Sequence, residues 1–87
     1  MSHPLEKGAM KDLQHTIHAV VRPGDEGGFV AECTEIAVVT QGDTLDETIA
    51  NLREAVSLHL ADEDLEALGL APSPVVVVSM EVYPVHA

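Results

Sequence analysis

One capped amphipathic helix, set between short apolar runs, most constrains how this chain can fold. Its start is marked by Thr44-Leu45-Asp46-Glu47, in which the Thr44 hydroxyl can accept from first-turn amides and Glu47 can reach back. Glycine and aspartate just before it, at 42–43, break the preceding run. Apolar residues then recur at spacings of four, three, four and four, which predicts one buried helix face: Leu45, Ile49, Leu52, Val56 and Leu60.

The residues before the helix predict three strands separated by turns. Apolar residues alternate along the first two runs, as they do on strands with one buried face. Proline and glycines between these runs predict a hairpin loop. The predicted elements are a strand at 14–22 with Ile17, Ala19 and Val21 on one face, a loop at 23–28, a strand at 29–33 with Phe29, Ala31 and Cys33 on one face, and a strand at 36–41.

The residues after the helix predict a short turn and a last strand. A helical turn is expected at 62–70, closed by a left-handed Gly69. Pro72 and Pro74 should bracket the entry to the last strand, at 75–83.

The predicted order is β-β-β-α-β. A strand–helix–strand connection normally makes the two strands parallel neighbours, so the last strand should lie parallel to the first. The expected fold is α+β, a mixed four-stranded sheet with one main helix. Residues 1–12 lack periodicity and predict a flexible N-terminal tail, which leaves 13–87 as a single domain.

The four consecutive valines Val75, Val76, Val77 and Val78 form the most apolar run. Such a run predicts a strand covered on both sides, either within the sheet or at a subunit interface. Only Phe29 and Tyr83 are aromatic, so the core of this 87-residue chain is small. Small cores often gain burial by self-association, and we therefore expect a homodimer or higher homo-oligomer.

Charge limits the classes of partner. Fifteen acidic residues against four basic ones give a formal net charge of −11, and the basic residues are scattered. Because nucleic-acid binding depends on Lys and Arg neutralising phosphates, we expect no direct nucleic-acid binding. An acidic surface suits a basic protein partner, although acidity also serves solubility or a high-salt cytoplasm. The single cysteine, Cys33, should be a small buried hydrophobe, and the lack of a signal-like or membrane-length apolar run predicts a cytoplasmic protein with no membrane association.

Residues able to support catalysis do not converge. His15 and His18, three apart on a strand, point to opposite faces and cannot share a metal ion. The strand at 14–22 contains no Asp or Glu, which disfavours a two-metal nuclease. The glycines at 24–28 lead into a strand and lack the Gly-Lys-Ser/Thr of a phosphate loop. We therefore expect no enzyme, no metal and no cofactor.

Two segments carry a family resemblance, GDEGGFVAEC at 24–33 and TQGDTLDETIANLREA at 40–55. They resemble the N-terminal domain of HicB-like antitoxins, which has an acidic GG turn, an aromatic-Val-Ala strand, and TQGDT before a helix. Thr34 stands where that family usually has proline, and 37–39 where it has a Pro-Gly-Cys-like stretch. The structural residues of the motif are Gly27, Gly28, Gly42 and Thr44.

The resemblance implies a partial RNase-H-like sheet without catalysis that binds a small basic RNA-cleaving toxin of the HicA type and blocks its catalytic histidine. Many family members also carry a C-terminal DNA-binding segment. The printed sequence continues only a few residues past the last predicted strand, so we expect no such segment. The alternative is a stand-alone HicB-like oligomeric binding or regulatory domain with a different partner.

Exposed charge at the hairpin tip and on the helix supplies the candidate contacts with a basic partner. They are Asp25, Glu26, Asp46, Glu47 and Glu54. The run Val75 to Val78 supplies the candidate oligomer interface.

Overall fold

The computed structural model describes residues 13–61 and 63–85. Its elements are β1 (Gln14–Pro23), β2 (Phe29–Cys33), β3 (Val39–Gly42), α2 (Leu45–Ala61) and β4 (Leu70–Met80). The tail predicted at 1–12 lies outside the described residues.

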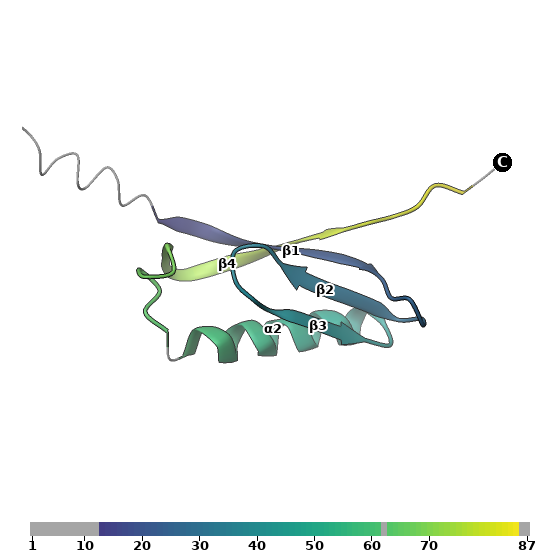
Figure 1. The fold of residues 1–87 in the computed structure, drawn as a ribbon, viewed down its shortest axis with the longest axis horizontal. Coiled ribbons are helices and arrows are strands. Elements are labelled where there is room, and N and C mark those ends of the chain that lie inside the picture. Colours follow the sequence, from purple (N-terminus) through teal and green to yellow (C-terminus); the bar gives the residue numbers. More distant parts are fainter. Residues whose placement is uncertain (1–12, 62, 86–87) are drawn as a thin grey trace, which may run out of the picture.

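The strands form one sheet in the order β3-β2-β1-β4. β1 pairs antiparallel with β2, and β2 pairs antiparallel with β3, whereas β4 pairs parallel with β1. Helix α2 lies along one face of this sheet (Figure 1). The predicted α+β class, the mixed four-stranded sheet with one main helix, and the parallel last strand are confirmed.

The core lies between this face of the sheet and α2. Ile17, Ala19 and Val21 of β1 are fully buried, as the alternation predicts. They pack in one cluster with Leu52 and Val56 of α2. The core is therefore aliphatic, as the scarcity of aromatic residues requires.

Helix α2 begins as predicted but buries a different first-turn residue. The N–H of Glu47 donates to Thr44 Oγ1 over 3.1 Å, and Glu47 Oε1 accepts from the N–H of Asp43 over 2.7 Å. The prediction that Leu45 is buried is wrong, because 37% of it is exposed. Thr48 is fully buried instead, and its hydroxyl donates to the Thr44 carbonyl over 2.7 Å.

The third strand is shorter than predicted. It begins at Val39 and not at 36, because Ile36 and Val38 turn into the core from a bend. The N–H of Cys33 donates to the Val38 carbonyl over 2.9 Å, which closes this bend.

The last strand begins earlier and ends earlier than predicted, spanning Leu70–Met80. A helical turn precedes it, closed by Gly69 at φ 80°, as expected. Pro72 and Pro74 lie inside the strand and do not bracket its entry. The register explains how, since Gln14 pairs with Leu70 but Thr16 already pairs with Val75, so that β4 bulges between these points.

The valine run lies on an edge strand. Val75 is 60% exposed and Val77 is 45% exposed. They alternate with Val76 and Val78, which lie on the α2 side of β4, and so they point to the opposite face of the sheet. The prediction that the run is covered on both sides within the sheet is wrong. The alternative, a subunit interface, remains a prediction.

Candidate partner-binding site

The loop between β1 and β2 is shaped by glycines. The N–H of Gly24 donates to the Gly28 carbonyl over 3.0 Å. Gly27 and Gly28 have φ values of 95° and 69°, in the left-handed region that glycine tolerates. A Cβ at Gly28 would also collide with the Gly42 carbonyl. The loop therefore lies close against the end of β3.

The first turn of α2 also packs against the end of β3. A Cβ at Gly42 would lie 2.7 Å from the backbone nitrogen of Thr48, so this glycine allows the helix to approach β3 closely. The bond from Asp43 to Glu47 fixes the turn between them. The motif residues Gly28, Gly42 and Thr44 thus bring the hairpin loop and the first turn of α2 together.

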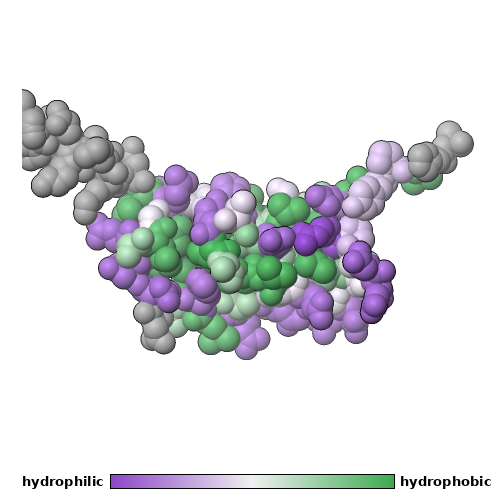
Figure 2. All heavy atoms as spheres, in the orientation of Figure 1, coloured by the Kyte–Doolittle hydropathy of each residue, from purple (hydrophilic) through white to green (hydrophobic). Residues whose placement is uncertain are grey.

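An open hollow of about 650 Å³ lies between these segments, and we call it the acidic hollow. Asp25 and Glu26 reach it from the loop, while Asp43 and Glu47 reach it from the helix start. Its other lining residues are Gly24, Gly27, Phe29, Val30, Gln41 and Gly42. Figure 2 shows hydrophilic residues at the end of the molecule where Figure 1 places this loop and the start of α2.

The structure brings together three of the five predicted contact residues. Asp46 and Glu54 are exposed on α2 but do not line the hollow. Helix geometry explains this, because Asp46 is turned about 100° from Glu47 and Glu54 lies about two turns farther along. Asp43 is a lining residue that the sequence analysis treated only as a strand breaker. Asp43 directly precedes the capping signal that begins at Thr44, and this position in the sequence could have identified it as a neighbour of Glu47.

Carboxylates in this arrangement suit cationic side chains, since hydrogen bonds between ionised groups are among the stronger polar contacts. Glu47 keeps one oxygen occupied by the Asp43 N–H, which fixes its direction. Over 13–61 and 63–85, no group of three or more His, Cys, Asp or Glu is placed to hold a metal ion. The hollow is therefore a surface suited to contacts with a basic partner.

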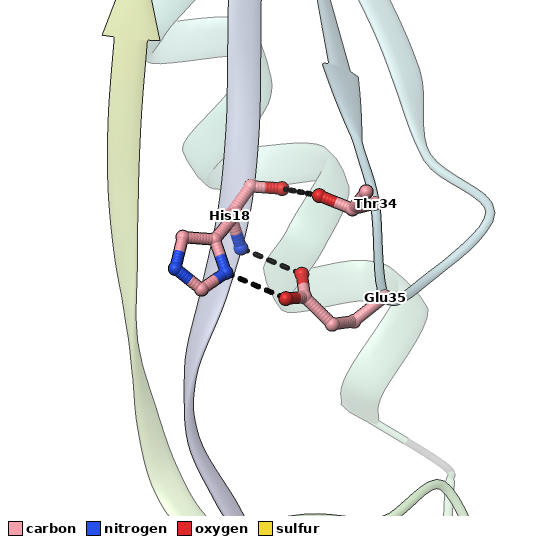
Figure 3. Close-up of polar contacts among 3 residues, drawn as sticks. All are labelled: His18, Thr34 and Glu35. Atoms are coloured by element: carbon pink, nitrogen blue, oxygen red, sulfur yellow. Dashed lines mark hydrogen bonds and ion pairs between the residues drawn. The ribbon is translucent and has the colours of Figure 1, made fainter.

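A polar clamp lies at the other end of β2 (Figure 3). The Glu35 carboxylate accepts from the backbone N–H of His18 and contacts its ring Nδ1, both over 2.6 Å. The N–H of Thr34 donates to the His18 carbonyl over 2.9 Å, and its hydroxyl donates to the same oxygen over 3.0 Å. A proline at position 34 would have no N–H to donate to the His18 carbonyl.

The clamp shifts the titration of Glu35. The ring of His18, followed by its backbone N–H, lowers the pKa of the Glu35 carboxyl group. His18 therefore pairs with Glu35, which follows β2. The sequence analysis considered His18 only as a possible metal ligand together with His15 and did not predict this contact. His18 and Glu35 lie 17 apart in sequence, so no local pattern relates them.

Cys33 is 7% exposed, as predicted for a small buried hydrophobe. Burial, followed by the nearby Glu35 charge, raises the pKa of its thiol. Both effects disfavour the reactive thiolate.

No helix within the described ranges is long and apolar enough to cross a membrane. No protein-family model, curated protein or solved structure matches the chain.

Proposed function

We propose that this chain is a HicB-like antitoxin that binds and neutralises a small basic HicA-type RNA-cleaving toxin, without catalysis of its own. On this proposal it acts in the cytoplasm, where such a toxin meets messenger RNA. Its sheet is then a partial RNase-H-like domain.

One observation carries the proposal. The two segments that resemble the antitoxin family, 24–33 and 40–55, together supply all the residues that line the acidic hollow. Asp25, Glu26, Asp43 and Glu47 there offer a basic protein a charged surface. Complementary charge of this kind speeds and orients encounter.

The second candidate is a stand-alone HicB-like binding or regulatory domain whose partner is not a toxin. The same acidic hollow supports it, because an acidic surface suits a basic partner whether or not that partner is toxic. Co-expression separates the two candidates.

Each short basic open reading frame beside the gene should be expressed alone and together with this chain. The antitoxin proposal predicts that one neighbour arrests growth alone and that co-expression restores it. If no neighbour is toxic and rescued, the antitoxin assignment fails and the regulatory domain takes its place. The purified chain should itself leave RNA intact in the presence of magnesium, and RNA cleavage by the chain would contradict both candidates.

Charge reversal tests whether the acidic hollow is the contact. The double variant D25K/E26K should lose rescue and slow association with the toxin, because it places two cations against a basic partner. The control E63K/E66K makes the same change of net charge at exposed positions outside the hollow. Association of the wild-type chain should also slow as salt rises, since exposed charges are screened beyond about 8–10 Å at physiological ionic strength. Equal loss in both double variants would show that net charge matters and the hollow does not.

A further inference from the structure

A second surface lies between α2 and β4 and is apolar. Helix α2 contacts β3 and β2 but makes no close backbone contact with β4 within the described ranges. A groove of about 420 Å³ remains between them. Ile49, Leu52, Val56 and Leu60 line it from the helix, and Val76 and Val78 line it from the strand.

The outer edge of β4 beside this groove offers free backbone groups. The N–H of Glu81 donates to the Val21 carbonyl, so it points toward β1. Backbone groups alternate sides along a strand, so those of Val76, Val78 and Met80 point outward. No strand of the described chain lies on that side. Such an edge is a template for pairing with another strand.

Residues 81–85 continue from β4 as an arm that extends beyond the sheet (Figure 1). Its apolar side chains are exposed to solvent: Val82 is 75% exposed, Tyr83 68% and Val85 95%. Among the residues that the structure describes, seven of the eleven exposed large hydrophobic ones lie within 75–85. Exposed apolar surface is thus concentrated on β4 and its arm, as at protein–protein contacts.

We propose that β4 pairs antiparallel with β4 of a second copy of this chain, so that each arm lies along the other copy's strand and groove. Twofold pairing requires one patch to contain both halves of the contact. The edge of β4 supplies the backbone groups, while the groove and the arm supply matching apolar surfaces.

The proposed pairing has its twofold axis at Ser79, a register that matches apolar residues of the two copies. A twofold axis perpendicular to the sheet sets each residue i opposite a residue whose number differs from i by an even number. Side chains directly opposite in an antiparallel pair point to one face. With the axis at Ser79, Val82 of each copy lies opposite Val76 of the other, on the groove side. Glu81 of each copy then lies opposite Val77 of the other copy, and the two Glu81 side chains do not face each other.

Charge also favours a second copy over a basic partner. The segment Leu70–Met80 contains no charged residue, although the chain carries a formal −11. Arg53, the charged residue lining the groove, is itself basic. Two highly acidic chains can therefore meet along β4 without placing like charges opposite each other, and the acidic hollow is left for other partners.

Sedimentation velocity at micromolar concentration tests this proposal independently of the proposed function. The wild-type chain should be a dimer, and Val78→Lys should be a monomer, because the dimer would bury an unpaired charge. Val39→Lys is the matched control, since it makes the same change at a 62% exposed valine on the other edge strand and should remain dimeric. Val82→Lys should also give monomers, and because this side chain is 75% exposed, the change cannot unfold the single copy.

Cross-linking tests the strand pairing itself. Under mild oxidation Ser79→Cys should form a covalent dimer much faster than Ala50→Cys, an exposed position on α2, because antiparallel partners lie within disulfide reach. A wild-type monomer would overturn the proposal. A dimer that survives Val78→Lys and Val82→Lys, or that fails to cross-link through residue 79, would overturn the β4 pairing.

Discussion

The two edge strands of the sheet differ in how much of the chain covers them. β3 has four residues and lies under α2, whose Asn51 side chain donates to the Gln41 carbonyl over 2.8 Å. β4 has 11 residues, makes no close backbone contact with α2 within the described ranges, and carries exposed valines. One edge is closed by the chain itself, and the other is left open.

Simple dimensions account for the difference. A helix with its side chains is about 10 Å wide, and neighbouring strands are about 4.8 Å apart. One helix therefore covers about two strands of a four-stranded sheet. Gly42 allows α2 to pack closely against β3. The part of the sheet that α2 covers least is therefore at β4. The same placement forms the acidic hollow at the closed edge and the apolar groove at the open one.

The largest expected effect tests whether the Leu52 face of α2 is packed in the core. Leu52→Ala should lower the free energy of unfolding by about 2–5 kcal/mol, because this side chain is 1% exposed and its loss leaves a cavity. Leu58→Ala makes the same change on the same helix at a 70% exposed position, and should cost less than about 0.5 kcal/mol. Urea denaturation at one fixed protein concentration measures both. Similar losses would mean that the helix is not packed as described.

The bond that closes the β3 edge gives the next effect. Asn51→Asp removes the donor and sets a carboxylate against the Gln41 carbonyl, which should cost about 0.5–1.5 kcal/mol at neutral pH, because the bond is exposed to water. Protonation restores a donor on this side chain. The loss relative to wild type should therefore shrink in acid, and a loss that does not change with pH would argue against this bond.

The clamp at the other end of β2 should give a smaller, pH-dependent effect. The pKa of Glu35 in the folded chain lies below its ordinary value of 4.5. Its stabilising contribution is therefore present above the unfolded pKa and is lost as pH falls through the folded one. Glu35→Gln should cost at most about 1 kcal/mol at neutral pH, because the pair is partly exposed. This difference should disappear in acid.

Glu63→Gln serves as the control for removing one negative charge, since Glu63 is exposed and outside the clamp. Thermal unfolding of both variants between neutral and acid pH isolates the contribution of the clamp. A Glu35→Gln deficit that grows as pH falls would contradict the assigned sign.

The parts of the fold that follow local periodicity were predictable from sequence. The alternation of Ile17, Ala19 and Val21 identifies β1, and the capping signal at Thr44 identifies the start of α2. Both signals come from residues that are close together in the sequence. Pro72 and Pro74 misled the prediction of β4, because prolines usually end a strand, whereas here a bulge and the edge position accommodate them.

The candidate site was predictable only in part, because it depends on how separate strands and the helix pack together. Charge at the hairpin tip and helix start identified Asp25, Glu26 and Glu47, but only the register of β2 against β3 shows that they share a hollow. The exposure of β4 depends on where α2 settles across the sheet. That position follows from contacts between distant segments, at Gly42 and Thr48, which no periodic pattern encodes.

The smallest expected effect is that of Thr40→Val, which is best compared with the same change at Thr48 on the closed side of the sheet. The Thr40 hydroxyl in β3 is buried, and no partner for it lies within the described residues. Thr48 is fully buried in α2, and its hydroxyl donates to the Thr44 carbonyl over 2.7 Å. Thr→Val keeps the shape of the side chain and removes the hydroxyl. Thr40→Val should be neutral or stabilise by up to about 1 kcal/mol, since it removes an unsatisfied polar group, whereas Thr48→Val should cost about 0.5–1.5 kcal/mol. Urea denaturation of both variants decides between these signs. If Thr40→Val lost as much stability as Thr48→Val, its hydroxyl would have a bound water as partner, and the β3 edge would be wetter than the packing beneath α2 implies.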